Sequence, residues 1–400
     1  MNRKTLLIRY GLVVLLTAIL VVLATACGHE DEPEPTPSTP PQEQTTPRTV
    51  LVYMVAQNNL SSYSTRDLSE IKQAIASGHL GNSRLLIYLD DNNSTPTLFE
   101  FEADGERNIL ADYDDETLSV SVSRMSQVID DAKRIAPARH YGLIMWGHGT
   151  GYLQNGIEED TLSPLSYGGE EVSKVSYWMN TTSMARALKG KGLDWIYFDC
   201  CFMAGVEVAY ELRDVTDYII ASATELPAVG MPYHLTLRHL MPEQSDLQGA
   251  AAETFGYFNG LSGSSRTCTI SLIDTSAIEQ LAQTVRTVLT NTAGLPDDYT
   301  PQAFQTTDDH NRYGWSYYDF QHYLLALAGT NTGYQDMVKS SIERAVVYAA
   351  ATPKLWNDVP LLNHCGLSTF IVERADDPDI DRKGYRELSW WNDVVSHRFK

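Results

Sequence analysis

The sequence predicts an α/β fold in which a mostly parallel sheet is flanked by helices on both faces. Nearly continuous apolar runs of strand length recur in the first 241 residues, and such runs indicate strands buried on both faces. They lie at residues 49–55, 84–89, 141–146, 195–198 and 218–221. Amphipathic stretches between and beside them predict helices at residues 64–77, 119–136, 180–188 and 204–212. Alternation of strands and helices in this order is typical of a parallel sheet.

The pattern loosens after residue 241. Helices are predicted at residues 246–257, 277–290, 318–327 and 336–349, and strands at 267–273 and 367–372. We therefore predict a main domain over residues 49–241 and a C-terminal α+β accessory region, residues 242–400, packed on it. No internal repeat is present.

The N-terminus has the features of a secretory signal. Basic residues precede an uncharged apolar run, residues 11–26, that ends in small residues. The sequence Leu23-Ala24-Thr25-Ala26-Cys27 resembles the bacterial lipoprotein cleavage box, whose cysteine is diacylated and becomes the mature N-terminus. We therefore expect a signal peptide over residues 1–27 and a lipid on Cys27. The length of the apolar run also fits a retained membrane-spanning helix.

Residues 28–48 form an acidic, proline-rich segment without aliphatic residues. Such a segment is too polar to fold on its own, and its prolines favour an extended chain, so it is predicted to be a linker between anchor and domain. The expected location is the cell envelope, with a lipid anchor in the outer membrane. The acidic residues 30–32 resemble a surface-export tag, and a solvated linker explains them equally well.

The charge, the cysteines and the histidines of the sequence argue against several classes of protein and site. The formal net charge of −21 argues against nucleic acid as a partner and fits cationic substrates. Of the five cysteines, Cys200 and Cys201 are adjacent and the others are far apart, which is not the spacing of a disulfide scaffold. The ten histidines show no HExxH motif or paired ligand spacing, so no metal site is expected.

Two predicted strands end in reactive side chains. Gly147-His148-Gly149 follows the strand at residues 141–146, and Asp199-Cys200-Cys201 follows the strand at 195–198. A thiol near a helix N-terminus ionises more readily, and a neighbouring imidazole can exchange a proton with it. Each residue alone has an ordinary structural explanation. Because the carboxyl ends of parallel strands meet at one edge of a sheet, we expect the thiol and the imidazole to share a cleft.

These motifs, in this order, resemble those of caspase-like cysteine peptidases and, in detail, the clostripain family. The matching segments are Val52–Met54 with Asn58–Leu60, Tyr141–Gly151, Asp199–Met203 with Glu207–Leu212, and Ala221–Tyr233. The resemblance starts at about residue 49 and weakens after 240, where Asp319-Phe320 and Gly366-Leu367-Ser368 continue it. It implies a caspase-like catalytic domain over residues 49–241 and cysteine endopeptidase activity.

The resemblance also implies roles for single residues. Cys201 would be the nucleophile and His148 the acid/base, with the backbone amides of Gly149 and Cys201 forming the oxyanion hole. Asp199 would lie in the primary specificity pocket and pair with an arginine or lysine of the substrate, because a basic side chain in a partly buried pocket needs a carboxylate partner. Cys200 stands where the family usually has alanine, so chemistry alone leaves two thiols, and the match to the motif selects Cys201.

No cofactor is expected. Some clostripain-like peptidases depend on calcium, but the turn at residues 57–59 is less acidic here than is usual in the family. The polar stretch 154–176 is predicted to be an exposed loop. Family members are often activated by self-cleavage in this interval, and Lys174 is the best-placed basic residue, because Arg186, Lys189 and Lys191 lie on or beside a predicted helix. An uncut loop is the alternative.

Two further functions are compatible with the sequence. One is a catalytically inactive surface lipoprotein that binds a peptide or glycan in the same cleft. The other is a peptidase of the same fold that does not prefer basic residues.

Overall fold

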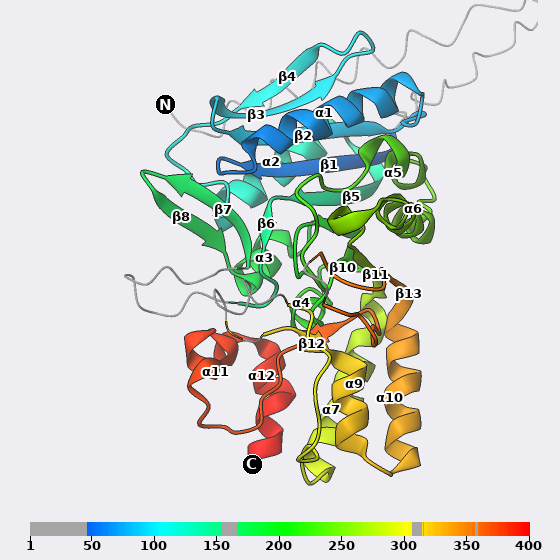
Figure 1. Cartoon of the computed structure of the whole chain (residues 1–400). Helices are drawn as coiled ribbons and strands as arrows, with labels where there is room; N and C mark the ends of the chain where they lie inside the picture. Colours follow the sequence, from blue (N-terminus) through cyan, green and yellow to red (C-terminus); the bar gives the residue numbers. More distant parts are fainter. Residues whose placement is uncertain (1–45, 154–165, 306–313, 315, 357–358) are drawn as a thin grey trace, which may run out of the picture. The chain divides into compact units, whose positions relative to one another are not determined.

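A nine-stranded sheet runs through the middle of the fold, with helices on both faces (Figure 1). The structure, a computed structural model, describes residues 46–153, 166–305, 314, 316–356 and 359–400, so the predicted signal peptide, Cys27 and residues 28–45 of the linker lie outside it. Five central strands are parallel, in the order β2 (Arg84–Asp91), β1 (Thr46–Ala56), β5 (Ala138–Trp146), β9 (Leu193–Asp199) and β10 (Thr216–Ala221). These are the strands that the apolar runs predict, and the α/β fold class is confirmed.

Both edges of the sheet are antiparallel. Beyond β2 lie β3 (Ser94–Phe101) and β4 (Arg107–Asp112), and beyond β10 lie β11 (Thr269–Asp274) and β13 (Val346–Ala351). The sheet is therefore mixed, with a parallel centre. The sequence patterns missed β3 and β4 and assigned the start of β13 to a helix. That helix, α10, ends at Ala345, because the following Val-Val-Tyr sequence favours a strand.

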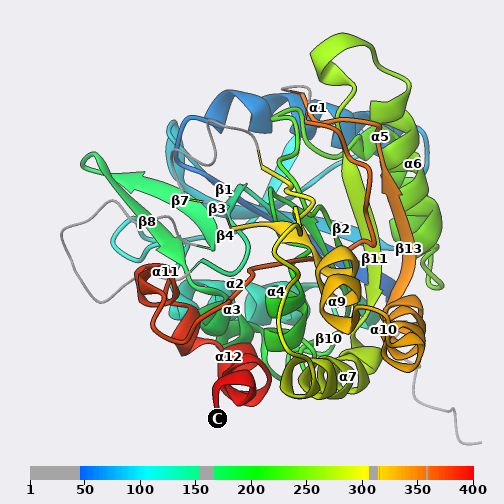
Figure 2. The same cartoon turned by 60° about the horizontal axis from the view of Figure 1, so that its bottom comes forward.

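The helices form a layer on each face of the sheet (Figure 2). One layer consists of α1 (Ser61–Ala76), α5 (Tyr233–Leu240) and α6 (Leu247–Asn259). The other consists of α2 (Val122–Ile135), α3 (Thr181–Leu188), α4 (Val206–Glu211), α7 (Ile278–Asn291), α9 (Phe320–Ala328) and α10 (Thr332–Ala345). Successive side chains of a strand point to opposite faces, so the apolar part of β1, residues 50–56, supplies both cores.

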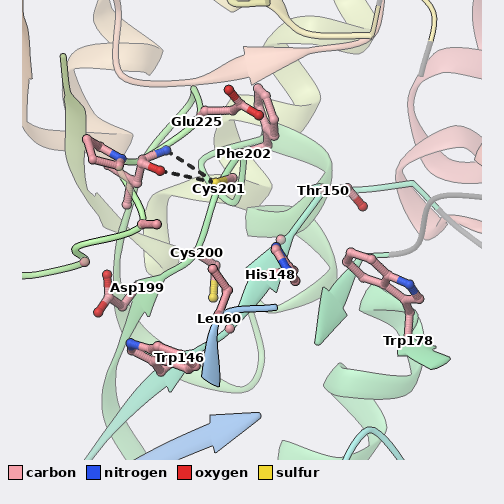
Figure 3. A pocket seen from close by; sticks show the side chains of 16 residues that line it. Leu60, Trp146, His148, Thr150, Trp178, Asp199, Cys200, Cys201, Phe202 and Glu225 are labelled. Carbon is pink, nitrogen blue, oxygen red and sulfur yellow. Dashed lines mark hydrogen bonds between the residues drawn. The ribbon is translucent and has the colours of Figure 1, made fainter. Parts of the chain in front are cut away.

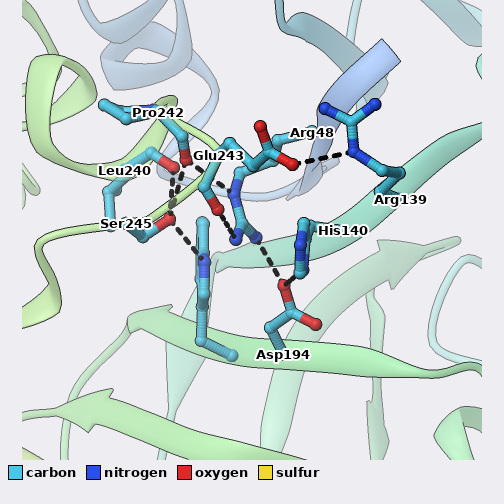
Figure 4. Close-up of polar contacts among 9 residues, drawn as sticks. Arg48, Arg139, His140, Asp194, Leu240, Pro242, Glu243 and Ser245 are labelled. Atoms are coloured by element: carbon cyan, nitrogen blue, oxygen red, sulfur yellow. Dashed lines mark hydrogen bonds and ion pairs between the residues drawn. The ribbon is translucent and has the colours of Figure 1, made fainter. Parts of the chain in front are cut away.

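Polar contacts join the amino ends of the central strands to the segment after residue 241 (Figure 4). Arg48 is the last residue of the predicted linker, residues 28–48, but the structure places it in β1, where it is buried. It forms a 2.9 Å ion pair with Asp194 and donates hydrogen bonds to the carbonyl oxygens of Pro242 and Glu243. His140 contacts the same carboxylate of Asp194 at 3.0 Å. Strand β1 thus begins earlier than predicted, because these partners offset the cost of burying a guanidinium.

The region after residue 241 shares the sheet with the region before it. Residues 45–400 form one compact unit, and β11 and β13 extend the sheet. Glu207 of α4 is fully buried, and its Oε1 accepts hydrogen bonds from Thr369, the Phe370 N–H and Tyr385. This carboxylate joins the C-terminal segments to the helix that follows Cys201. The boundary at residue 241 stays a prediction from composition.

The remaining C-terminal elements are short. They are β12 (Tyr318–Asp319), β14 (Ser368–Thr369), α11 (Pro378–Arg382) and α12 (Ser389–Asp393). The predicted strand at residues 367–372 corresponds to β14. Within the described ranges, no helix combines the length and the apolar character that a membrane span requires.

The order of the central strands creates a switch point between β1 and β5. After β1 the chain passes to β2 on one side, and then to β5, β9 and β10 on the other. Ligands of such sheets bind outside the carboxyl ends of the strands at this point. Met54 pairs with Trp146, and Trp146 pairs with Asp199. The segments that follow β1, β5 and β9 therefore leave the sheet side by side.

A three-stranded sheet follows β5 in the chain and consists of β6 (His148–Gly149), β7 (Tyr167–Val172) and β8 (Val175–Met179). The prediction of an exposed loop over residues 154–176 is wrong from residue 167 onward, and residues 154–165 lie outside the described part. The sequence there is polar and rich in glycine, so it did not indicate strand β7, whose first four residues are buried. Ser173 and Lys174, with φ of 53° and 70°, form the tight turn at its tip.

Candidate active site

A pocket of about 210 Å³ lies at the carboxyl ends of β5 and β9 (Figure 3). It is lined by His148, Gly149, Asp199 and Cys201, so the structure brings together the four residues that the resemblance selects. They come from the β5–β6 segment and from the turn between β9 and α4. His148 and Cys201 each follow, by two residues, the paired positions Trp146 and Asp199. The register of the two strands therefore sets both side chains at the same height above the sheet.

Cys201 lies in a sharp turn between β9 and α4. The next residue, Phe202, has a φ of 61°, and such a conformation costs a non-glycine residue roughly 1–3 kcal/mol. Two contacts hold the turn: the Phe202 ring stacks on Tyr317 with centroids 4.1 Å apart, and the Phe202 N–H donates to the Thr224 carbonyl. The turn leaves Cys201 half-buried, with the Leu226 N–H 3.3 Å from its sulfur.

The neighbouring thiol is in a different environment. Cys200 is 2% exposed, and its Sγ donates to the Met145 carbonyl at 3.0 Å. Burial, followed by the charge of Asp199, raises the pKa of the Cys200 thiol well above its ordinary value. A protonated, enclosed thiol is a poor nucleophile. The structure thus distinguishes two thiols between which chemistry alone could not choose.

His148 is held on two sides. Its Nε2 lies 2.7 Å from Oδ1 of Asn59, in the turn after β1. The Trp178 ring of β8 lies 5.9 Å away, centroid to centroid, at an angle of 38°. His148 and Gly149 pair with Gly168 and Tyr167, so strand β7 fixes the backbone that carries the imidazole.

Gly149 is required by a close approach of two backbone segments. A Cβ at this position would lie 2.4 Å from the carbonyl oxygen of Cys201, 2.8 Å from the Cβ of Cys200 and 3.2 Å from the Cys201 nitrogen. Only glycine allows this contact. The backbone after β5 and the backbone of the cysteine turn are therefore in direct contact at the pocket.

Asp199 is a buried carboxylate in the wall of the pocket. Its Oδ1 accepts from the Met231 N–H at 2.8 Å, and its Oδ2 accepts from the Tyr233 hydroxyl at 3.1 Å. Burial raises the pKa of Asp199 to about 7, although these two hydrogen bonds lower it. A Cβ on Gly230 would lie 2.8 Å from Oδ2, so glycine is needed there too. Within the described residues, the carboxylate has hydrogen-bond donors but no cationic partner.

A second buried carboxyl group lies behind this wall. Asp67 of α1 is fully buried, and its Oδ2 accepts from the Trp146 indole N–H at 2.7 Å. Its Oδ1 has no hydrogen-bond partner in the described structure. Burial, followed by the charge of Asp199, raises the pKa of Asp67 to about 9. A carboxyl group with this pKa is protonated at neutral pH, so Asp67 brings no charge to the pocket. It contacts the pocket wall through Trp146.

The other predicted site residues do not join this group. Lys174 does not line the pocket and is exposed at the tip of the β7–β8 turn. Cys27 lies outside the described residues. In the ranges that the structure describes, no cluster of three or more His, Cys, Asp or Glu side chains could hold a metal ion. At the rim, the carboxylate of Glu225 accepts from the Trp356 indole at 3.0 Å.

Sequence reasoning assigned no role in the site to Asn59, Trp178 or Asp67, although Asn59 lies in a segment that matches the family. A signal for Asn59 was available, because it follows β1 and the rule that sites lie at strand carboxyl ends applies to β1 as it does to β5 and β9. Trp178 and Asp67 gave no signal. A tryptophan in an unrecognised hairpin and a carboxylate in a helix have no local feature that marks them as part of a pocket.

The chain is similar to known proteins of one protease family. The family model of clostripain, Peptidase C11, matches residues 52–381. An inactive zymogen of a C11 protease from Parabacteroides distasonis is 31% identical to the chain, covers 88% of this chain and 98% of its own, and superposes with a TM-score of 0.74.

Two structures from Bacteroides thetaiotaomicron are also similar. A secreted C11 cysteine protease, iotapain, has the same fold at 22% identity, 88% and 99% coverage and a TM-score of 0.75. A secreted C11 cysteine protease in complex with an irreversible peptide inhibitor is 25% identical, with coverage of 87% of this chain and 99% of its own and a TM-score of 0.71. No curated protein matches the chain.

Proposed function

The chain belongs to the clostripain family and is a cysteine peptidase, and we propose that it cleaves peptide bonds after arginine or lysine. Cys201 is the nucleophile and His148 its proton-transfer partner in this proposal. The observation that supports it most directly is the composition of a single pocket, in which a half-buried thiol and an imidazole lie beside a buried carboxylate.

In the acylation step, the Cys201 sulfur attacks the carbonyl carbon of the scissile bond while His148 holds the thiol proton. The backbone N–H of Leu226, 3.3 Å from the sulfur, supports the thiolate form. His148 then gives the proton to the leaving amine, the C–N bond breaks, and a thioester remains. In the second step His148 takes a proton from water, the hydroxide attacks the thioester, and the Cys201 thiolate leaves.

Two backbone amides hold the oxyanion in this mechanism. The Thr150 N–H donates to the Ser166 carbonyl at 2.9 Å. Because hydrogen-bond directions alternate along an antiparallel pair, the Gly149 N–H points away from β7. The close approach between Gly149 and the backbone of Cys201 supports a shared role for their two amides.

The preference for basic residues rests on Asp199. A guanidinium or ammonium group that enters the pocket finds a carboxylate already held by two donors and without a cation beside it in the described structure. Acidic substrate side chains are rejected for the same reason, because a carboxylate in this pocket would meet a like charge.

A panel of peptides with Arg, Lys, Ala or Asp before the scissile bond tests the proposal on the full-length chain. We expect turnover of the Arg and Lys peptides only. Equal turnover of the Ala peptide would indicate a peptidase without basic preference, and no turnover of any peptide would favour the inactive, ligand-binding lipoprotein.

A matched pair of variants tests the choice of thiol. Cys201→Ala is expected to abolish turnover, while Cys200→Ala keeps it within a few-fold, because the Cys200 thiol is buried and bonded to a backbone carbonyl. Retained activity in Cys201→Ala would contradict the assignment.

The lipid anchor is proposed from the sequence of residues 1–48. Cys27 is diacylated, and the proline-rich linker connects it to β1, which tethers the enzyme to the outer membrane. Metabolic labelling with a palmitate analogue should mark the wild-type chain and not Cys27→Ser. Labelling of both would locate the lipid elsewhere.

Self-activation by cleavage after Lys174 is proposed as well. One of the similar structures is an inactive zymogen of a C11 protease. Lys174 is an exposed basic residue at the tip of the β7–β8 hairpin, whereas Arg186 lies within α3 and Lys189 at its C-terminal end. Cleavage there produces a new N-terminus at Val175. N-terminal sequencing of purified enzyme, with Cys201→Ala as the uncut control, tests this, and any other start removes the assignment.

A further inference from the structure

The side chain of Asn59, in the turn after β1, contacts the imidazole of His148. Its Oδ1 is 2.7 Å from Nε2 of His148. Asn59 lies three residues after the end of β1, the strand at the switch point of the sheet, whereas His148 lies two residues after the end of β5. The contact therefore joins the two sides of the switch point.

The turn that carries Asn59 is itself fixed. The preceding Asn58 is 3% exposed; its Oδ1 accepts from the Leu60 N–H, and its Nδ2 donates to the carbonyl oxygens of Val55 and Gly168. Gly168 is also the residue that pairs with His148 in the β6–β7 ladder. The turn and the imidazole are thus both held against Gly168, which sets the position of Asn59 relative to the ring.

We propose that Asn59 is a positioning residue that completes a Cys201–His148–Asn59 arrangement. An amide oxygen only accepts hydrogen bonds, so the contact places the ring proton of neutral His148 on Nε2. The proton exchanged with Cys201 is then carried by Nδ1. When His148 is protonated, the same oxygen accepts from a positively charged donor, and such hydrogen bonds are the stronger ones.

Trp178 completes the enclosure of the ring. Its indole lies 5.9 Å from the imidazole, and an aromatic face within about 6 Å favours the cationic form of its neighbour. Gly169, with a φ of 72°, passes beside both rings, since a Cβ there would lie 3.1 Å from His148 and 3.1 Å from Trp178. Amide and indole together leave the imidazole little freedom to rotate away from the pocket.

This inference rests on the proposed function of His148, and it predicts a specific kinetic effect. Asn59 does not line the pocket, so its removal should lower kcat and leave KM unchanged. We expect Asn59→Leu to lower kcat about 10- to 100-fold, the scale on which one oriented hydrogen bond to the catalytic imidazole acts. Asn59→Asp keeps the acceptor and adds a negative charge, so its kcat should stay within a few-fold of wild type.

The pH profile separates positioning from a general structural effect. A carboxylate beside the ring extends the protonated form of the imidazole to higher pH, so the alkaline limb of kcat should move up in Asn59→Asp and down in Asn59→Leu. Asn92→Ala is the matched control, because Asn92 donates to the Asn58 carbonyl of the same turn and does not contact His148. Its profile should not move. An equal shift of the alkaline limb of kcat in Asn92→Ala and Asn59→Leu would overturn the inference.

A second readout does not depend on turnover. In the full chain with Cys201→Ala and nitrogen-15-labelled histidine, the nitrogen shifts of residue 148, identified by its absence in a His148→Ala variant, report which ring nitrogen carries the proton. We expect the Nε2–H form, and its loss in Asn59→Leu. An Nδ1–H form in the presence of Asn59 would refute the positioning role. If no peptide is turned over but the Nε2–H form is found, the proposed activity fails and the positioning of His148 stands.

Discussion

Replacing Asp199 by asparagine tests how substrate specificity arises. The carboxylate is 6% exposed, and its acceptors are used by one backbone N–H and one hydroxyl. Asparagine has the same shape. Its oxygen can keep the bond from the Met231 N–H, and its amide can donate to the Tyr233 hydroxyl, so the pocket should remain intact while the charge is lost.

The magnitude follows from the burial of the pair. Removing one partner of a buried, hydrogen-bonded ion pair costs about 3–5 kcal/mol, because the other charge is left without compensation. At about 1.4 kcal/mol per tenfold, kcat/KM for Arg and Lys peptides should fall by roughly two to three and a half orders of magnitude. Hydrolysis of an Ala peptide does not use this charge and should be unchanged or slightly faster.

The assay is kcat/KM for Arg, Lys and Ala peptides in wild type and Asp199→Asn, measured between pH 5.5 and 8.5. With the pKa of Asp199 near 7, wild-type activity on basic peptides should fall up to tenfold per pH unit below that value, and the variant should lack this dependence. A loss of activity that is equal for the Arg and Ala peptides would refute the role of Asp199 in specificity.

Stability provides an independent check on the same variant. The pKa of Asp199 is about 7 in the folded chain and near 3.9 when unfolded, so the folded state retains a proton that the unfolded state releases. Ionisation therefore lowers stability as pH rises through this window, by at most about 4 kcal/mol. Asp199→Asn should be more stable than wild type at pH 8 and equal to it at pH 4. Denaturant unfolding at the two pH values measures this difference, and a destabilised variant at pH 8 would show that the pocket had not stayed intact.

Three further variants test the supports of the site. Gly149→Ala should abolish turnover while the chain stays folded, because its Cβ would lie 2.4 Å from the Cys201 carbonyl oxygen; circular dichroism and a peptide assay check both. Burial raises the pKa of Glu170 to about 7, so wild-type stability is lost as pH rises from about 4.3 towards that value. Glu170→Gln should therefore have a higher unfolding free energy than wild type, and this gain should be larger at pH 8 than at pH 5 by up to about 3 kcal/mol. An equal gain at both pH values would contradict this. Glu207→Ala should destabilise the chain by about 3 kcal/mol or more in denaturant unfolding, because three buried donors lose their acceptor, and a change below 1 kcal/mol would argue against its anchoring role.

Much of the fold was predictable because its signals are local. The runs at residues 49–55 and 141–146 are nearly continuous apolar sequences, as expected of strands buried on both faces, and the structure contains both as central strands. The β7 strand was not predictable. Its Gly-Gly-Glu-Glu sequence is polar, and its buried Glu170 accepts a hydrogen bond from the Val120 N–H at 3.1 Å, a partner 50 positions away in the sequence.

The candidate site divides in the same way. The family and the α/β class were predictable from the sequence alone. So was the pocket that His148 and Cys201 share, because each residue follows a parallel strand and the carboxyl ends of such strands lie at one edge of the sheet. Tertiary packing was needed to show which of the two adjacent thiols is enclosed, which amide contacts His148, and that Asp67 lies close to Asp199. These features depend on distances between segments far apart in the chain, and burial, which sets the pKa of the carboxyl groups and of the enclosed thiol, exists only once those segments have packed together.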